Sequence, residues 1–256
     1  MQEATTSLAN RPVWVDLSST DATASMEFYR KVFGWQIDVS DDPQYGGYGL
    51  ARIEGADVAG IGSQMAPGAP TVWNLYIATD DADELASRIE TAGGSVVAPP
   101  FDVGKMGRMA VFEDPGGAFI STWQAGAMRP QPTGAANTFG WPELNTHGLE
   151  RSIPFYLEVF GWDHRTTPIG PDGPSYTEFL LGGESVAGAQ DISPGLPTEM
   201  PSYWMVYFNA DDVDETYRRA IEAGATEMVS PSDFPGGRFA IVMDPQGAMF
   251  GVLKAS

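Results

Sequence analysis

The stretch FYRKVFGW at residues 28–35 decides the fold, because it returns as FYLEVFGW at residues 155–162. Two further pairs follow in the same order. VWNLYIATDDADE, which starts at Val72, matches YWMVYFNADDVDE, which starts at Tyr203, and EDPGGA from Glu113 matches MDPQGA from Met243. The offsets between the copies are 127, 131 and 130 residues. Such a constant offset over a whole chain predicts a duplicated structural unit, in which the elements are kept and only the loops change length.

Length and composition narrow the class of protein. The chain has 256 residues, 43% of them hydrophobic, which is enough for two domains that each bury a core. Its net charge of −20 and its 14 scattered Lys and Arg argue against nucleic-acid partners and against an anionic membrane surface. No apolar run reaches the roughly 18 residues that span a bilayer, and the polar N-terminus does not look like a secretory signal. We therefore expect a cytoplasmic protein, and the lack of cysteine excludes disulfides and thiolate chemistry.

The repeat also sets the expected domain boundaries. Residues 1–11 read as an N-terminal tail, 12–124 as the first domain, 125–138 as an Ala-, Gly- and Pro-rich linker, and 139–256 as the second domain. Within each domain, the alternation of short β-type stretches with amphipathic stretches predicts the order β-α-β-β-β twice. In the first helix, Asp21 is the expected N-cap and Gly34 the expected stop. The DDxDE segments at Asp80 and Asp211 are interpreted as helix starts rather than cation sites.

These motifs resemble the vicinal oxygen chelate superfamily, which includes glyoxalases, bleomycin-resistance proteins and extradiol dioxygenases. The FYxxVFGW helix end, the strand that runs into DDxDE, and the closing DPxGAxF strand carry the resemblance over nearly the whole chain. The pattern is similar to the fused two-domain type found in actinobacteria. The resemblance implies an α+β fold of two tandem glyoxalase-like domains, each made of two βαβββ modules that form a curved, cup-like mixed sheet with the helices outside.

The resemblance also implies where a metal would be held, because enzymes of this superfamily bind a divalent ion with His, Gln or Glu on the inner face of the sheet. Counted from the motifs, these positions hold Trp14, Asn74 and Ser121 in the first copy. In the second copy they hold Trp141, Met205 and Gly251. None is a good ligand for Zn, Fe, Mn or Mg. The sequence therefore predicts no metal and no other cofactor.

In place of a metal, the inner face is expected to carry aromatic rings and one carboxylate in each copy. The expected inner-face residues are Trp14, Asp16, Asn74, Tyr76, Ser121 and Trp123 in the first copy, and Trp141, Glu143, Met205, Tyr207, Gly251 and Leu253 in the second. Two readings stay open for them. The rings can simply fill the sheet, and the carboxylates can pair with Arg108 and Arg238. Alternatively, Asp16 and Glu143 are functional, because burying a carboxylate on an inner strand face without a partner costs free energy.

The expected function follows from this cup. The first hypothesis is a metal-free protein that binds a small organic ligand, for instance to sequester an antibiotic or an aromatic metabolite. The alternative is a metal-independent isomerase, cyclase or lyase that acts on a carbonyl or polyketide-like metabolite, with Asp16 or Glu143 as general base. An interaction protein without a ligand is a third possibility. A homodimer and a pairing of the two copies within one chain both remain open.

Overall fold

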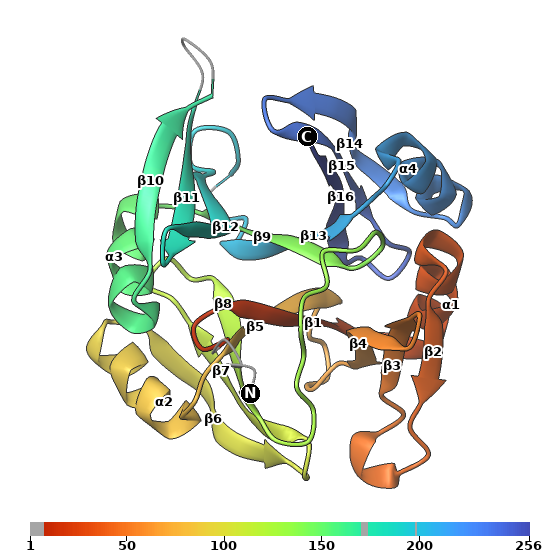
Figure 1. Ribbon diagram of the computed structural model, residues 1–256, viewed down its shortest axis with the longest axis horizontal. Helices are drawn as coiled ribbons and strands as arrows, with labels where there is room; N and C mark the ends of the chain where they lie inside the picture. Colours follow the sequence, from red (N-terminus) through yellow and green to blue (C-terminus); the bar gives the residue numbers. More distant parts are fainter. Residues whose placement is uncertain (1–7, 170–173, 198) are drawn as a thin grey trace, which may run out of the picture. The chain divides into compact units, whose positions relative to one another are not determined.

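The computed structural model describes residues 8–169, 174–197 and 199–256, so the part of the expected tail at residues 1–7 lies outside the described residues. The elements follow the duplicated order, as Figure 1 shows. In the first half they are β1 (Pro12–Ser19), α1 (Ala22–Phe33), β2 (Gln36–Val39), the 3-10 turn η1 (Pro43–Tyr45), β3 (Gly49–Ile53), β4 (Ala56–Ser63), β5 (Val72–Ala78), α2 (Ala82–Thr91), β6 (Ser95–Val103), β7 (Gly107–Glu113) and β8 (Phe119–Ala125). In the second half they are β9 (Phe139–Thr146), α3 (Leu149–Phe160), β10 (Asp163–Pro168), β11 (Ser175–Leu181), β12 (Glu184–Asp191), β13 (Tyr203–Asn209), α4 (Val213–Glu222), β14 (Thr226–Phe234), β15 (Gly237–Met243) and β16 (Met249–Ala255).

Each half of the chain builds one eight-stranded mixed sheet. The strand orders are β2-β3-β4-β1-β5-β8-β7-β6 and β10-β11-β12-β9-β13-β16-β15-β14. The first strand of a module lies parallel to its last strand, as in the β1–β4 and β5–β8 pairs, and the hairpin strands between them run antiparallel. The expected α+β fold with two tandem domains, each of two βαβββ modules, is confirmed.

Local sequence explains where the helices begin and end. Asp21 accepts a hydrogen bond from the Ala24 backbone N–H at 3.0 Å, and Gly34 ends α1 in the left-handed region at φ 72°, as expected. The DDxDE motifs start helices, as expected, and their second Asp is the N-cap, Asp81 in one copy and Asp212 in the other. In both motifs the second Asp is the one placed to accept from the first free backbone N–H groups.

Contacts within the chain divide it into two compact units, and each unit takes parts from both sequence halves. Unit 1 contains the described residues before Trp14, Tyr76–Arg129 and Leu144–Trp204. Unit 2 contains Trp14–Leu75, Pro130–Glu143 and Met205–Ser256. In unit 1 helix α2 packs beside α3, and in unit 2 helix α1 packs beside α4 (Figure 1). A helix from one copy of the repeat therefore has a helix from the other copy as its neighbour.

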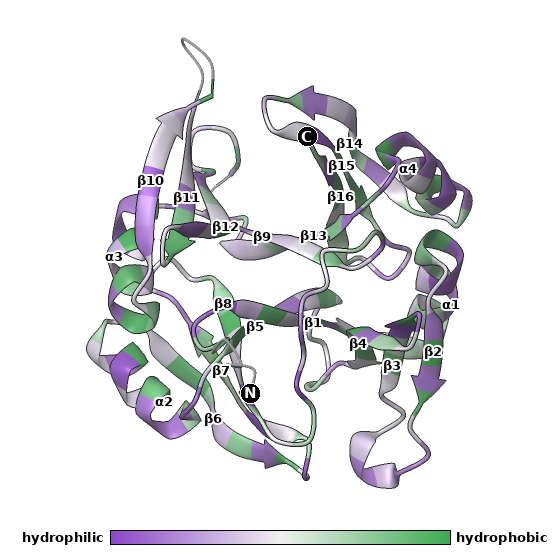
Figure 2. Cartoon of the chain, in the orientation of Figure 1, coloured by the Kyte–Doolittle hydropathy of each residue, from purple (hydrophilic) through white to green (hydrophobic). Residues whose placement is uncertain are grey.

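The repeated FYxxVFGW motif supplies the core of each unit. Tyr29, Phe33 and Trp35 pack against one another and against Phe208 and Phe250 from the second half, with ring centroids 4.9–6.0 Å apart. In unit 1 the motif rings Tyr156, Phe160 and Trp162 pack with Phe179 and Trp204, which come from the same half of the chain. The helices bury this side and turn a polar side outward, which Figure 2 shows as green and purple along each helix.

A hydrogen-bonded Trp–Tyr–Asp relay fastens each of these cores to the DPxG turn of the other half. In unit 1, Trp204 Nε1 donates to the Tyr156 hydroxyl at 3.1 Å, and this hydroxyl donates to Asp114 Oδ2 at 2.9 Å. In unit 2, Trp73 Nε1 donates to the Tyr29 hydroxyl at 2.9 Å, which donates to Asp244 at 2.9 Å. Burial raises the pKa of both Asp114 and Asp244, although backbone N–H groups that donate to them act in the opposite direction.

The segment before each half's first strand is anchored in the same way. Trp162 Nε1 donates to the backbone carbonyl of Asn10 at 2.7 Å, and Trp35 Nε1 donates to that of Asn137 at 2.8 Å. Asn10 and Asn137 both adopt the left-handed region, with φ of 65° and 61°, which asparagine tolerates better than most residues. The described end of the N-terminal tail is thus bound to the second half's FGW motif.

Candidate functional site

A polar cluster centred on Asp16 lies on one face of β1 in unit 2. Asp16 Oδ1 accepts a hydrogen bond from Asn74 Nδ2 at 2.9 Å, and the same amide nitrogen lies 2.9 Å from Ser18 Oγ. Asp16 Oδ2 accepts from the Tyr48 hydroxyl at 3.2 Å. Side chains alternate along a strand, so Asp16 and Ser18 share this face while Val15 and Leu17 are buried on the other. We name Trp14, Asp16, Ser18, Tyr48 and Asn74 the Asp16 cluster.

Tyr48 can lie close against the sheet because the two residues beneath it, Gly60 and Gly62, have no side chains. A Cβ added at Gly60 would lie 1.7 Å from the Tyr48 hydroxyl oxygen, and one added at Gly62 would lie 2.9 Å from the Tyr48 ring. Desolvation and then the neighbouring Asp16 charge raise the pKa of Tyr48 well above its ordinary value, against a lowering hydrogen bond from the Trp14 indole. Tyr48 is therefore a protonated donor at neutral pH, and its proton points at Asp16.

The second half carries a related but more closed arrangement in unit 2. The Tyr207 hydroxyl donates to Glu143 Oε1 at 3.3 Å, and both residues are less than 9% exposed. The Tyr207 ring lies across Gly251, where an added Cβ would come within 2.1 Å of it. Met205 is buried and Trp141 is partly exposed. The structure thus brings Glu143 and Tyr207 together, as the sequence pattern suggested.

The remaining expected residues of the first copy belong to unit 1. Tyr76 and Ser121 face each other across the β5–β8 pair, and both are buried. The Trp123 ring meets Tyr76 edge-on at 6.4 Å, and its Nε1 donates to the Met128 backbone carbonyl at 3.1 Å. Trp123 also covers Gly107, so it is packed on several sides. For Trp123 the core-filling reading fits these contacts.

The arginines proposed as partners of the two carboxylates have other partners. Arg108 pairs with Asp83 at 3.0 Å and with Asp102 at 2.9 Å. Arg238 likewise pairs with Asp214 and Asp233, at 2.7 and 2.8 Å. All of these pairs are exposed, and Arg108 and Arg238 occupy matched positions in the two copies. The salt-bridge explanation for Asp16 and Glu143 is therefore wrong for these arginines.

Of the two histidines, only one is exposed. His164 on β10 is exposed. His147 is half-buried at the end of β9, and its Nε2 lies 3.0 Å from the Met200 backbone oxygen. The strand-to-helix turn is covered by the loop before β13, which sequence reasoning did not anticipate.

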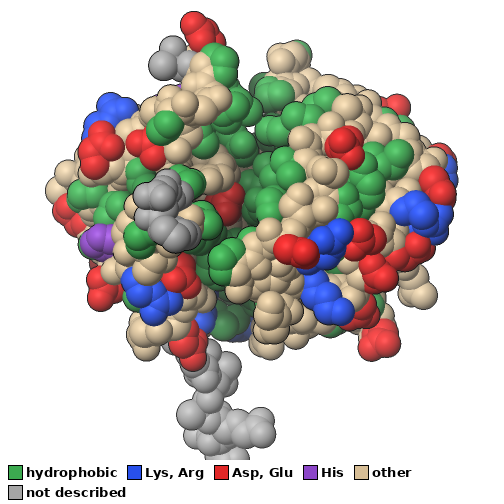
Figure 3. Space-filling model, turned by 90° about the horizontal axis from the view of Figure 1, so that it is seen from above, with side chains coloured by type: hydrophobic (Ala, Val, Ile, Leu, Met, Phe, Trp, Pro, Cys, Tyr) green, Lys and Arg blue, Asp and Glu red, His purple; other side chains and the backbone are tan. Residues whose placement is uncertain are grey.

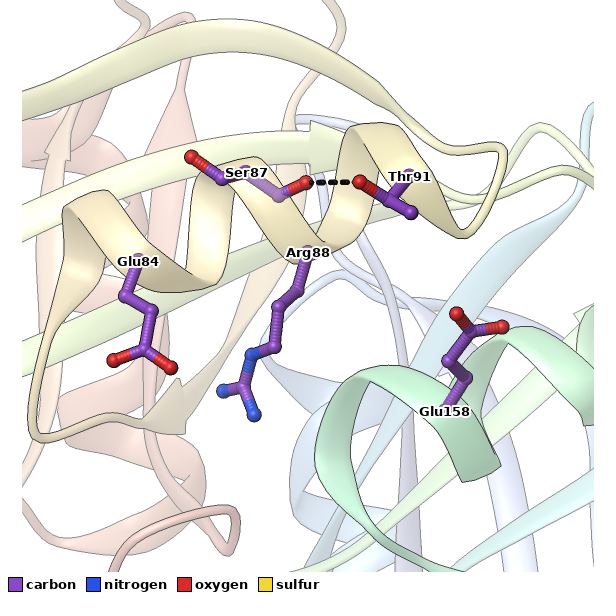
Figure 4. A pocket seen from close by; sticks show the side chains of 5 residues that line it. All are labelled: Glu84, Ser87, Arg88, Thr91 and Glu158. Atoms are coloured by element: carbon purple, nitrogen blue, oxygen red, sulfur yellow. Dashed lines mark hydrogen bonds between the residues drawn. The ribbon is translucent and has the colours of Figure 1, made fainter.

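A shallow depression of 230 Å³ lies between α2 and α3 of unit 1. Glu84, Ser87, Arg88 and Thr91 of α2 line it, together with Glu158 of α3 (Figure 4). The Thr91 hydroxyl donates to the Ser87 backbone carbonyl at 2.9 Å, so it serves the helix itself. The depression contains none of the inner-face residues and offers only one guanidinium between two carboxylates.

Charged side chains on the surface are scattered, as the sequence composition suggests. Figure 3 shows acidic and basic side chains in small mixed groups on one face of the molecule, without a continuous basic patch there. Within the described residues, no helix is both long and apolar enough to cross a bilayer.

Comparison with known proteins places this architecture in a family. The family model described as the glyoxalase/bleomycin resistance protein/dioxygenase superfamily matches residues 11–122 and 138–252. The chain belongs to this superfamily. The two matched segments cover most of the chain, one in each copy of the repeat.

Several superfamily members are close in sequence. "Putative glyoxylase CFP32" of Mycobacterium tuberculosis is 41% identical over 253 residues, which is 95% of this chain and 94% of the relative. "Anthracycline biosynthesis protein DnrV" of Streptomyces peucetius is 38% identical over 258 residues, covering 95% of this chain and 92% of the relative.

Solved superfamily structures confirm the fold at lower identity. The Mn(II)-bound glyoxalase from Novosphingobium aromaticivorans superposes with a TM-score of 0.66 at 18% identity, over 96% of this chain and 82% of that one. The 2,3-dioxygenase LapB from Pseudomonas sp. KL28 gives a TM-score of 0.68 at 15% identity, over 98% and 94% of the two chains. At these identities the likeness concerns the fold alone.

The residues at the superfamily's metal positions do not fit a divalent cation. Trp14 gives its only polar group, the indole N–H, to Tyr48, and Gly251 has the Tyr207 ring over it. Asn74 turns its amide nitrogen, a donor, toward the cluster. Among the described residues, no three His, Cys, Asp or Glu side chains gather where they could hold a metal ion. These side chains do not offer the imidazole and carboxylate ligands that Zn, Fe, Mn and Mg prefer.

Sequence reasoning missed Tyr48, Ser18 and the glycines beneath Tyr48. A signal was present: Gly60 and Gly62 alternate along β4, so both open the same face of the sheet. Tyr48 also has a counterpart in Tyr176 at an offset of 128 residues, close to the 127 of the helix motif. The repeat, read in the β3 region as well, would have singled out this tyrosine.

Proposed function

We propose that this protein binds a flat, uncharged, partly apolar organic molecule at the Asp16 cluster without the help of a metal. The observation that carries the proposal is the carboxylate itself. Asp16 is partly exposed on an inner strand face and is oriented by two neutral donors, Tyr48 and Asn74, and Tyr48 is itself hydrogen-bonded to the buried Trp14 indole. A carboxylate so oriented suits a hydroxyl or amine donor on a ligand, since hydrogen bonds to charged groups are the stronger kind.

The relatives support an aromatic ligand. One of them is named for anthracycline biosynthesis, whose products are polycyclic and aromatic, and it aligns with nearly the whole of this chain. The net charge of −20, together with the site's own carboxylate, disfavours anionic ligands. Sequestering of an antibiotic or of an aromatic metabolite is the role that fits such a site.

A metal-independent enzyme is the second candidate, and the Asp16–Tyr48 pair favours it. A carboxylate and a protonated hydroxyl 3.2 Å apart place a general base beside a proton donor. An isomerase, cyclase or lyase acting on a carbonyl or polyketide-like metabolite would use Asp16 to remove a proton. Tyr48 would then stabilise the oxygen on which negative charge develops. The Glu143–Tyr207 pair offers the same two groups in the second half.

Replacing each carboxylate by its amide separates the two candidates. For a binder, Asp16→Asn should weaken binding of an uncharged aromatic probe with a free hydroxyl group, such as 2-naphthol, by about 10- to 100-fold, as the loss of a charged hydrogen bond predicts. For an enzyme, turnover of the identified substrate should fall by about 10²–10⁴ while binding persists.

Glu143→Gln is the matched control. It should have the smaller effect, because Glu143 is almost fully buried whereas Asp16 is partly exposed. Binding is measured by titration calorimetry and by quenching of tryptophan fluorescence. If neither amide changes the binding of a probe that the wild-type protein demonstrably binds, the carboxylates do not belong to the site.

A further inference from the structure

The side of β15 and β16 that faces away from α4 is apolar along its whole length. Helix α4 packs on the other side of these strands, where Arg238 forms an ion pair with Asp214 of the helix (Figure 1). Because side chains alternate along a strand, the odd-numbered residues of β15 and β16 share the side away from α4. Every one of these positions holds Gly, Ala, Met, Phe, Ile or Leu. Strands that are apolar on both sides are typical of sheets covered on both sides.

The register of β14, β15 and β16 brings the apolar side chains of this side together within unit 2. Met243 lies opposite Met249, and Phe239 lies opposite Leu253. The Phe234 ring, 39% exposed, meets the Phe239 ring edge-on at 5.9 Å and extends the group at one end. We name the half-buried members of the group the apolar face, which consists of Val229, Phe239, Ile241, Met243, Met249 and Leu253.

The first copy of the repeat carries a charge at the corresponding place. Glu113 holds the position of Met243, 130 residues earlier in the chain. It pairs with Phe119 across the β7–β8 hairpin, just as Met243 pairs with Met249 across β15 and β16. The uncharged surface is therefore a property of the second copy, and the shared backbone accepts a carboxylate at this position.

The size of the apolar face suits a small molecule rather than a protein. Neighbouring strands lie about 4.8 Å apart and alternate residues about 6.8 Å apart along a strand, so three strands by three rows measure roughly 10 by 14 Å. A stable protein interface needs about 800 Å² on each partner, which is several times this area. A fused aromatic ring system is flat, as the face of a sheet is. The neighbouring thioethers of Met243 and Met249 favour an aromatic occupant over an aliphatic one, because contacts between sulfur and aromatic rings are attractive.

We propose that the apolar face is a second binding site, which takes the uncharged surface of a fused aromatic molecule without any hydrogen bond. The site shares no residue with the Asp16 cluster, so the proposal goes beyond the function proposed above and stands independently of it. Release of water from the apolar surfaces of protein and ligand drives the binding. A charged ligand is disfavoured, because it would lose its hydration against side chains that offer it no partner.

Pyrene is the probe for this site, because it is flat and uncharged and has neither a hydrogen-bond donor nor an acceptor group. The ratio of its vibronic emission bands, followed as protein is added, reports its transfer from water to an apolar site and gives the affinity. Wild-type protein should bind pyrene. Met243→Glu introduces the residue of the first copy and should weaken this binding by at least about tenfold, because the new carboxylate would lose hydration beneath the rings.

Two further variants complete the test. Met65→Glu is the matched control: Met65 is 71% exposed between β4 and β5, so this variant adds the same charge away from the face and should keep the affinity within about twofold of wild type. Met243→Gln keeps the length of the side chain and adds polarity without charge, and it should weaken pyrene binding by at least about threefold. Urea midpoints establish that each variant is folded, and Met243→Gln decides alone if Met243→Glu is not.

Several results would overturn the proposal. Wild-type protein that does not bind pyrene, or folded Met243 variants that bind it as wild type does, would remove the site. If 1-decanol displaces pyrene as effectively as anthracene does, the face selects apolar surface regardless of shape, and the aromatic class is wrong. A dimer seen in sedimentation experiments that Met243→Glu abolishes, in a protein that does not bind pyrene, would assign the face to a second copy of the chain instead.

Discussion

Replacing Tyr156 by phenylalanine removes a single oxygen atom from the centre of unit 1. The ring stays, so the buried apolar surface hardly changes. The lost hydroxyl donates to Asp114 at 2.9 Å and accepts from Trp204 at 3.1 Å, and all three residues are less than 9% exposed. Burial and the charge of Asp114 raise the pKa of Tyr156 well above its usual value, so it is a protonated donor over the whole working range.

The expected cost can be worked from these two contacts. Losing a hydrogen bond to a charged group costs about 1.5–3 kcal/mol, and a buried indole N–H left without an acceptor costs about 1–3 kcal/mol. Asp114 keeps its bonds from Gly116 and Ala118, so its charge is not left alone. With part of the loss recovered by relaxation, we expect Tyr156→Phe to lower the free energy of unfolding by about 3 kcal/mol.

Urea unfolding followed by tryptophan fluorescence measures this change, and Tyr217→Phe is the matched control. Tyr217 also donates to a carboxylate, that of Glu227, but at the surface of α4. Its loss should leave the urea midpoint close to that of wild type, because exposed pairs contribute little to stability. If Tyr156→Phe unfolds at the same urea concentration as Tyr217→Phe, the relay does not stabilise the unit and this reasoning is refuted.

Two other predictions follow from the same structure. Burial raises the pKa of Asp114 in the folded protein. A carboxyl group with a raised folded-state pKa stabilises the folded protein fully at a pH below its unfolded pKa. This stabilisation is lost as the pH rises through the folded-state pKa. Asp114→Asn lacks this contribution, so wild type should exceed the variant in stability by more near about pH 4 than at pH 7. Urea midpoints measure this difference at each pH. A difference that shrinks on acidification would contradict the prediction. Elemental analysis of untagged protein should find no stoichiometric Zn, Fe, Mn or Ni, and EDTA should not change the affinity for 2-naphthol; one metal per domain would restore a glyoxalase-type centre.

Much of the fold could be predicted from sequence because its signals are local and occur twice. Asp21 and Gly34 bound the first helix through cap chemistry that acts over three or four residues. The order of helices and strands along each copy, β-α-β-β-β twice, was expected from the sequence and is confirmed. The composition of the compact units was not foreseen. It depends on Tyr29 meeting Asp244, 215 residues away, and nothing in a local pattern specifies which copy of a DPxG turn a given tyrosine reaches.

The candidate site was predicted in part for a similar reason. Asp16 and Asn74 share a face through strand alternation, which a count along the chain reveals, and they are indeed hydrogen-bonded. Tyr48 comes from the segment that joins η1 to β3, where no periodicity applies. Its ring occupies the space above Gly60 and Gly62, where any side chain would clash with it. A hydropathy pattern does not reveal which glycines make room for another side chain.

The interlaced make-up of the two units has a consequence for cutting the chain. A protease that cleaves within residues 125–138 separates the two copies of the repeat covalently, but each compact unit still consists of pieces from both fragments. The two Trp–Tyr–Asp relays and the anchors at Asn10 and Asn137 then act as joints between separate polypeptides. The halves of this gene should accordingly behave as a split protein: neither half should be well folded by itself, and mixing the two should restore both units at once.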